Sequence, residues 1–112
     1  MSKRQERVSE QIHRAVSELL TFETQDPRLD NLTVTRAEVT GDLRRATVYI
    51  LPGRTPEETR TALAGLHHAQ NYLRRALAEQ LQLRFVPELE FAIDERTAQA
   101  NRVEKLLDDL KD

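Results

Sequence analysis

Apolar residues near the N-terminus recur at the spacing of an amphipathic helix. They stand three or four positions apart and form one stripe: Val8, Ile12, Ala15, Val16, Leu19 and Leu20. Ser2 and Gln5 have the spacing of a capping box, which starts a helix at this point. Asp26-Pro27 ends it, because the residue before a proline is pushed out of the α region. The pattern predicts a helix over about residues 3–24.

Two stretches that follow are rich in β-branched residues and alternate in polarity. Residues 32–39 change phase, since apolar side chains fall on even positions in the first half and on odd positions in the second. One extra residue near Arg36, a β-bulge, accounts for this shift. Residues 44–51 alternate again, and the segment 40–43 between the two strands predicts a hairpin turn.

A second helix begins with strong local signals. Thr55 is a good cap, Pro56 suits the first helical position, and Glu58 completes a capping box. The apolar pattern runs to about Gln82, but the leucine rhythm slips by one step around Asn71. Asparagine tolerates a left-handed backbone. The pattern predicts a kink or a helix–turn–helix there and leaves a continuous helix open.

The last third of the sequence predicts one strand and one helix. Residues 85–93 alternate, with apolar positions on one face: Phe85, Leu89, Phe91 and Ile93. Pro87 predicts that the first half of this strand lies at an edge or a bulge. A helical stripe over residues 95–110 predicts a C-terminal helix within the segment 94–112. The pattern therefore indicates one α+β domain over residues 1–112, with a three-stranded sheet covered by helices on one face.

Composition narrows the class of protein further. The chain has 112 residues and no cysteine, which excludes disulfides and thiolate sites. Its apolar runs are far shorter than the ~20 residues that span a bilayer. The charged N-terminus is not a signal peptide. We therefore expect a cytoplasmic protein that makes no membrane contact.

Candidate catalytic groups are sparse. His67 and His68 are neighbours on a helix, so their side chains diverge by about 100° and do not chelate one metal ion. The serines all lie in the first predicted helix, and three glycines form no nucleotide-binding loop. We expect no enzyme, no metal and no cofactor.

The net charge of −2 conceals an uneven distribution. Residues 60–85 carry four arginines against one glutamate, whereas residues 86–112 carry four basic against eight acidic residues. Arg74, Arg75 and Arg84 form a basic cluster of the kind that contacts phosphate, although a merely solvated face is the alternative. With five aromatic residues in the chain, a base-stacking platform is not expected. Contacts to phosphate, sugar and RNA shape are expected instead.

Several short segments occur in an order and at a spacing that are typical of one family. The segments are Asp26-Pro27-Arg28, Ala46-Thr47-Val48-Tyr49, Leu66-His67-His68-Ala69 and Val86-Pro87-Glu88-Leu89. Over about residues 4–110 the chain resembles ribosome-binding factor A, a family of bacterial assembly factors for the small ribosomal subunit. The resemblance implies a KH-like domain of type II topology.

The family departs from ordinary KH domains at their G-x-x-G loop, which clamps nucleic-acid backbone. The resemblance implies a helix–kink–helix in its place. The matching positions here are Ala69, Gln70 and Asn71, so an asparagine stands where the family has a glycine. This substitution puts the geometry of the kink in question, since asparagine is more strained than glycine in a left-handed turn.

The resemblance also implies a function. It points to a non-catalytic factor that binds free 30S subunits, assists late maturation of 16S rRNA at its 5′ end, and supports growth in the cold. A ribosome-associated GTPase is implied as the agent of release, and we expect a monomer. The residues expected to contact rRNA are Arg45, Arg74, Arg75 and Arg84, with Arg7, Arg14 and Arg28 as secondary candidates.

Two other functions stay open from the residues alone. One is a stand-alone KH-like domain that binds a different RNA. The other is a protein-interaction module built on the acidic C-terminal residues 104–112. The dependence of binding on ionic strength distinguishes the protein-interaction module from RNA binding, because affinity for phosphate falls steeply with salt.

Overall fold

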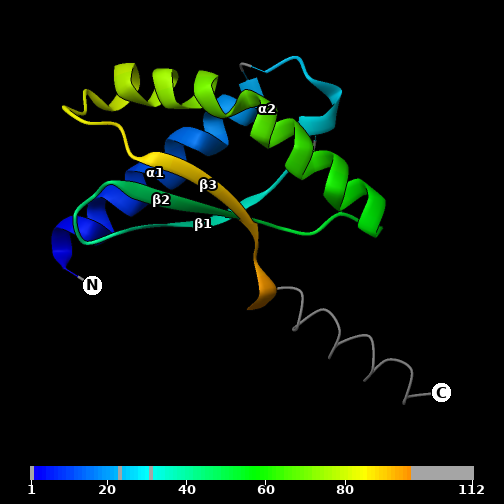
Figure 1. The fold of residues 1–112 in the computed structure, drawn as a ribbon, viewed down its shortest axis with the longest axis horizontal. Coiled ribbons are helices and arrows are strands. Elements are labelled where there is room, and N and C mark those ends of the chain that lie inside the picture. The colour runs from blue at the N-terminus through cyan, green and yellow to red at the C-terminus, as the bar shows by residue number, and fades with distance from the viewer. Residues whose placement is uncertain (1, 23, 31, 97–112) are drawn as a thin grey trace.

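A computed structural model describes residues 2–22, 24–30 and 32–96 (Figure 1). Its elements, in chain order, are α1 (Lys3–Phe22), the short 3-10 helix η1 (Pro27–Leu29), β1 (Val34–Val39), β2 (Arg45–Ile50), α2 (Pro56–Leu81) and β3 (Glu88–Ile93). The C-terminal helix predicted within residues 94–112 lies outside the described residues from position 97 onward. Among the described helices, none is long and apolar enough to cross a bilayer.

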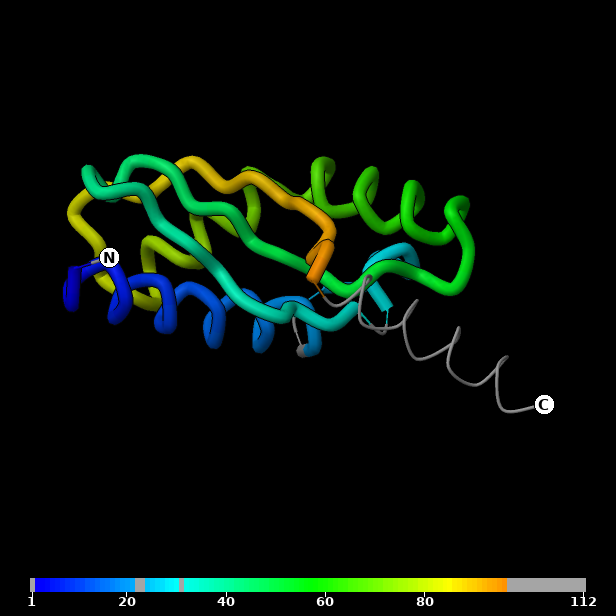
Figure 2. Tube along the Cα trace, turned by 90° about the horizontal axis from the view of Figure 1, so that it is seen from below, coloured from blue at the N-terminus to red at the C-terminus, as the bar shows by residue number. Residues whose placement is uncertain are grey.

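The strands form one mixed sheet in the order β1-β2-β3. β1 and β2 pair antiparallel through the predicted hairpin, and β3 pairs parallel to β2 after the long α2 crossover. α1 packs against β1, and α2 packs against β3. α1 runs along the length of the sheet (Figure 2). The α+β class expected from the sequence is confirmed.

Within the described residues, the helices cover one face of the sheet. On β2 the side chains of Ala46, Val48 and Ile50 are fully buried, whereas the two residues between them are half-buried. The core on that face joins both helices to the sheet through Ile12, Leu66 and their apolar neighbours. This is the two-layer arrangement that the alternating pattern predicts.

The caps of both helices follow the sequence. The Gln5 backbone N–H donates to Ser2 Oγ at 3.1 Å, and the Ser2 N–H donates to Gln5 Oε1 at 3.0 Å. At α2, the Glu58 N–H donates to Thr55 Oγ1 at 3.1 Å. The Glu58 carboxylate accepts a hydrogen bond from the Arg54 N–H at 2.8 Å. In a strict capping box the donor is the N–H of the cap residue itself, here Thr55, which follows Arg54 by one position.

The predicted bulge in β1 lies at Thr35. Val34 pairs with Ile50 and Arg36 pairs with Tyr49, so two steps along β1 match one step along β2. The extra residue changes which side chains face the core, as the shift in apolar phase predicts. The Thr35 hydroxyl donates to Oδ2 of the buried Asp94 at 2.7 Å and so ties the bulge to the end of β3.

The other face of the sheet carries a stacked pair of side chains. The Arg36 guanidinium lies 3.7 Å from the centre of the Tyr49 ring. Arg36 Nε also lies 3.6 Å from Asp94 Oδ2, within an ion pair. Tyr49, an aromatic side chain on the face away from the helices, is therefore covered by an arginine rather than left open.

α2 is one continuous helix of 26 residues. It changes direction near its middle, as both views show (Figures 1 and 2). Among the described residues, the non-glycine positions with a positive φ are Leu43 and Gln82. Asn71 therefore stays helical, and no left-handed turn forms there. The continuous helix left open by the sequence is the one observed.

β3 is shorter than its sequence pattern suggests. It begins at Glu88, after Pro87, because proline has no N–H to donate to a neighbouring strand. The prediction that Phe85 belongs to the apolar face of this strand is wrong. Phe85 lies in the loop before β3, and 78% of its surface is exposed.

Helix side chains reach the outer edges of the sheet. On β3, the Gln70 amide donates to the Leu89 carbonyl. On β1, the Val39 N–H donates to Ser9 Oγ at 3.2 Å, and His13 Nε2 lies 3.0 Å from the Val34 carbonyl oxygen. These three backbone groups, which face away from the neighbouring strand, are thus satisfied by side chains of α1 and α2.

Candidate nucleic-acid interface

Three segments distant in sequence meet at one end of the molecule. They are the first turns of α1, the β1–β2 turn and the α2–β3 loop, all on the left of Figure 1 and again on the left of Figure 2. They line a cleft of about 700 Å³. The charged residues lining it are Arg4, Asp42, Arg44, Arg74, Arg84 and Glu88. Four guanidinium groups thus face two carboxylates.

The positive charge of this cleft is available to a ligand. Within the described residues, Arg4, Arg44 and Arg84 form no ion pair. The Asp42 carboxylate accepts hydrogen bonds from Thr40 Oγ1 at 2.6 Å and from the Arg44 N–H at 3.1 Å. These bonds hold the pKa of Asp42 below its usual value. Asp42 therefore stays ionised near neutral pH and orders the turn that carries Arg44.

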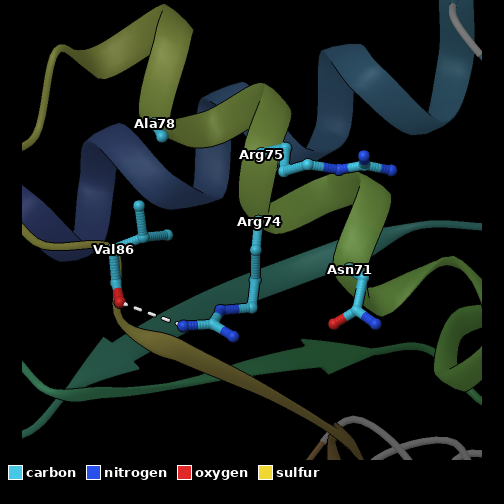
Figure 3. A pocket seen from close by; sticks show the side chains of 5 residues that line it. All are labelled: Asn71, Arg74, Arg75, Ala78 and Val86. Carbon is cyan, nitrogen blue, oxygen red and sulfur yellow. Dashed lines mark hydrogen bonds between the residues drawn. The ribbon is translucent and has the colours of Figure 1, made fainter.

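Arg74 has a partly structural role. Its side chain is half-buried, and Nε donates to the Pro87 carbonyl at 3.3 Å. A terminal nitrogen lies 3.5 Å from the Val86 carbonyl oxygen, the contact dashed in Figure 3. Arg74 thereby ties the α2–β3 loop to α2.

A second hollow of about 500 Å³ adjoins the cleft through Arg74 and Val86. It is lined in addition by Asn71, Arg75 and Ala78. Figure 3 shows Asn71 and Arg74 extending from α2 toward β3, while Arg75 extends in another direction along the helix. Arg75 is exposed, so its charge lies beside this hollow rather than inside the core.

The three positions that the resemblance assigns to the kink have different surroundings. Ala69 is half-buried against the core, and Gln70 donates to the Leu89 carbonyl of β3. Asn71 is exposed and lines the second hollow. Gln70 lines a separate hollow between α2 and β3, and Asn71 is the more exposed of the two.

The other arginines predicted to contact rRNA lie outside both hollows. Arg45 is exposed at the start of β2, 4.0 Å from Glu90. Arg14 pairs with Glu10 at 3.8 Å, and Arg7 is exposed on α1. The structure therefore brings Arg74 and Arg84 together, places Arg75 beside them, and leaves Arg45, Arg7 and Arg14 apart.

Arg28 is also held elsewhere. It lies in η1, where its guanidinium donates to both carboxylate oxygens of Asp26, the shorter contact being 2.7 Å. This pair lowers the pKa of Asp26 and raises that of Arg28. The side chain is engaged in its own loop.

Sequence reasoning missed Arg4, Arg44 and Phe85 as cleft residues. Arg4 and Arg44 lie in different elements and meet only because α1 packs along β1. Phe85 was assigned to the core by its alternation. Pro87, which stops the strand, was the available signal that Phe85 lies outside it.

No group of three or more histidine, aspartate or glutamate side chains in the described part of the chain is placed to hold a metal ion. The fold and the cleft define a small α+β domain that presents an arginine-rich surface at one end of its sheet.

The chain belongs to the ribosome-binding factor A family, whose model matches residues 4–107. It is 39% identical over 110 residues to ribosome-binding factor A of Citrifermentans bemidjiense, covering 98% of this chain and 92% of that protein. The crystal structure of ribosome-binding factor A from Thermus thermophilus is similar with a TM-score of 0.71 and 32% identity. That match covers 80% of this chain and 93% of the Thermus chain.

A second similar structure concerns a complex. It is a homology model of the Thermus thermophilus factor fitted into the cryo-electron-microscopy map of a complex with the 30S subunit. Its TM-score is 0.63 at 34% identity, and it covers 75% of this chain and 88% of that one.

Proposed function

We propose that this protein binds free 30S ribosomal subunits in the cytoplasm and assists late maturation of 16S rRNA, including its 5′ end. It does so without covalent chemistry. The observation that carries the proposal is the arginine-lined cleft in a chain of the ribosome-binding factor A family. The fitted complex of the Thermus relative with a 30S subunit supports the choice of partner.

Phosphate contact supplies the affinity in this proposal. Arginine offers planar, bidentate donors to phosphate oxygens and keeps its charge at all physiological pH values. The cleft and Arg75 present such groups on one end of a chain whose net charge is −2. A local basic surface thus attracts rRNA although the whole chain is slightly acidic.

Maturation follows from differential binding. A protein that binds one rRNA conformation more tightly than another shifts the population toward it, by no more than the difference in affinity. The factor then favours a subunit conformation in which 5′ processing proceeds, and nucleases perform the cleavage. Release by a ribosome-associated GTPase and a role in cold growth stay predictions of the resemblance.

The test is co-sedimentation of the purified protein with 30S subunits, 50S subunits and 70S ribosomes. We expect binding to 30S particles alone, weakening as salt rises. Arg75→Glu and Arg84→Glu should each weaken 30S binding about tenfold or more, as expected for loss of a charged contact. Arg54→Glu is the matched control, since Arg54 is exposed, lies outside both hollows and is not among the residues expected to contact rRNA. Undiminished pelleting of both charge-reversed variants would refute this placement of the interface.

A cellular assay separates maturation from mere binding. Cells lacking the protein should accumulate 16S precursors with extended 5′ ends, most strongly in the cold. The wild-type chain should restore mature ends, and the Arg75→Glu/Arg84→Glu double variant should not. If the binding-deficient variant restored processing fully, the cleft would not be the route by which the protein acts.

A further inference from the structure

Phe85 is an exposed aromatic ring inside a positively charged cleft. Its surface is 78% exposed, although a single exposed apolar residue is by itself unremarkable. What distinguishes Phe85 is its surroundings. The cleft around it is lined by four arginines, and the Arg84 guanidinium carbon lies 5.7 Å from the centre of its ring.

We propose that this cleft binds an unpaired RNA nucleotide, whose base stacks on Phe85 while Arg4, Arg44 and Arg84 contact the phosphates on either side. The inference rests on the proposed function and names the RNA element that the site recognises. It replaces the expectation, drawn from the low aromatic content, that contacts stop at phosphate, sugar and shape.

The chemistry of the site favours an unpaired nucleotide over a helix. A base within an RNA duplex is stacked on both faces, so only a base that is splayed out offers a face to an aromatic side chain. Single-strand sites combine such a ring with positive groups that follow the backbone. The cleft of about 700 Å³ lies within the ~300–1,000 Å³ typical of small-ligand sites.

The ring is presented by an ordered loop. Gln82, the residue that follows α2 and caps it, has a left-handed conformation, which turns the chain sharply before Phe85. After Phe85, the Val86 and Pro87 carbonyls are held by Arg74, and the Glu88 N–H donates to the Arg44 carbonyl at 2.8 Å. Because the loop is fixed on both sides of Phe85, little conformational entropy is lost when a ligand binds to the ring.

An acidic peptide is the competing occupant, because it also complements arginine. The exposed ring favours RNA, since every base has a π-face to stack on it whereas aspartate and glutamate have none. Arginine planes also stack on bases. Titration with an acidic peptide therefore distinguishes the two occupants.

The chain has no tryptophan, which makes the test direct. Phe85→Trp creates a single indole in the cleft, and its fluorescence reports stacking. We expect quenching on titration with a single-stranded hexaadenylate or hexauridylate, and none with a blunt RNA duplex of six base pairs or with hexaglutamate. Tyr72→Trp is the matched control, because Tyr72 is exposed on α2 but does not line the cleft. Quenching by hexaglutamate and not by RNA would overturn the proposal.

The affinity for the hexanucleotide, measured on variants that carry no tryptophan, supplies a second test. Phe85→Leu keeps an apolar side chain without a π-face and should bind the hexanucleotide about tenfold more weakly, while Phe85→Tyr should bind as the wild type does. Arg44→Gln should lower the salt slope of binding by about 0.7, the value for one single-strand phosphate contact. Arg54→Gln should leave it unchanged, since Arg54 is exposed and lines neither hollow. Equal affinity of the Leu and Tyr variants would contradict stacking.

The two proposals fail separately. If the wild type pellets with 30S subunits but Phe85→Trp shows no quenching and Phe85→Leu pellets as well as wild type, the nucleotide site is wrong and the proposed function stands. If single-stranded RNA quenches the indole but no ribosomal particle is bound, the site stands and the proposed function is wrong. Circular dichroism checks that each variant is folded, which the exposure of Phe85 leads us to expect.

Discussion

Two of the described non-glycine residues adopt a left-handed backbone conformation, which costs an L-residue about 1–2 kcal/mol. Leu43, with φ 59°, closes the β1–β2 turn, and Gln82, with φ 51° and ψ 40°, ends α2. Leu43 recovers part of that cost by packing against the core. Gln82 is exposed and has no such contact with the core, so its strain is the easier to relieve.

Gln82→Gly should stabilise the protein by about 0.5–1 kcal/mol. Glycine has no steric penalty in the left-handed region and is the preferred residue just beyond a helix, although it also raises the entropy of the unfolded chain. Urea unfolding monitored by circular dichroism measures the change. Gln80→Gly, within the same helix, serves as the control and should destabilise, because its backbone is helical. A loss of stability at position 82 equal to that at position 80 would contradict the left-handed cap.

Asp26 gives the fold a dependence on pH. The hydrogen bonds and charge of Arg28 lower the pKa of this carboxyl below its ordinary 3.8. A lowered pKa in the folded state means that the pair's stabilisation is complete above about pH 4 and is lost as pH falls through the folded-state pKa. Asp26→Asn should therefore lower the melting temperature at pH 7. The difference from wild type should shrink as pH falls below about 4.

Thermal melts at several pH values test this dependence. Asn keeps an acceptor for the Arg28 N–H, which Asp26 Oδ1 accepts at 2.9 Å, so the variant removes mainly the charge. Arg28→Gln should show the same convergence at low pH. A difference that persisted unchanged to pH 2 would show that the carboxylate charge is not its source.

At the scale of elements, the close approach of α2 to η1 depends on a glycine. A Cβ built at Gly65 would lie 3.0 Å from Arg28 Cβ and 3.0 Å from Leu29 Cδ2. Leu29 is buried in the core, and Arg28 is held by Asp26, so neither neighbour withdraws easily. The absence of a side chain at Gly65 lets the helix and the loop pack together.

Gly65→Ala should destabilise the protein by about 1 kcal/mol, because overpacking outweighs the better helix propensity of alanine. Urea unfolding of the single variants and of the double variant Gly65→Ala/Leu29→Ala gives the coupling between the two positions. We expect the double variant to lose less than the sum of the two single losses. Strict additivity would show that the contact with Leu29 does not matter.

Most elements could be predicted because their signals are local. The caps at Ser2 and Thr55 and the bulge at Thr35 depend on residues within a few positions of each other. The error arises where a local pattern meets a wider constraint. Phe85 continues the alternation of β3 but precedes Pro87, and the strand begins only after that proline. At Asn71 the sequence left two alternatives open, and the continuous helix is the one observed.

At the scale of the molecule, the site was only half predictable. Arg74 and Arg84 are near each other in sequence, and their cluster was visible as a run of positive charge. Arg4 and Arg44 join them through the packing of α1 against β1, which no sequence spacing reveals. Whether Arg45 contacts rRNA from the outer face of the sheet stays a prediction.

The charge distribution predicts a measurable dependence on salt. If Arg4, Arg44, Arg75 and Arg84 contact phosphates, the plot of log affinity for 30S subunits against log salt should have a slope of about −3. The double variant Arg44→Gln/Arg84→Gln should reduce that slope to about −1.5. Sedimentation between 50 and 300 mM KCl measures both slopes, with Arg54→Gln as the control. A slope near zero for the wild type would mean that phosphate contacts do not drive binding.

The side chains that reach the edges of the sheet have a consequence for the protein in a crowded cell. An exposed strand edge is a template on which another chain can add a strand, and such addition leads to aggregation. Here α2 occupies the Leu89 carbonyl of β3 through Gln70, and α1 occupies backbone groups of β1 through Ser9 and His13. These groups are already bonded and do not offer themselves to a strand of a second copy. The two helices that build the core thus also occupy part of each outer edge of the sheet, which disfavours strand addition there.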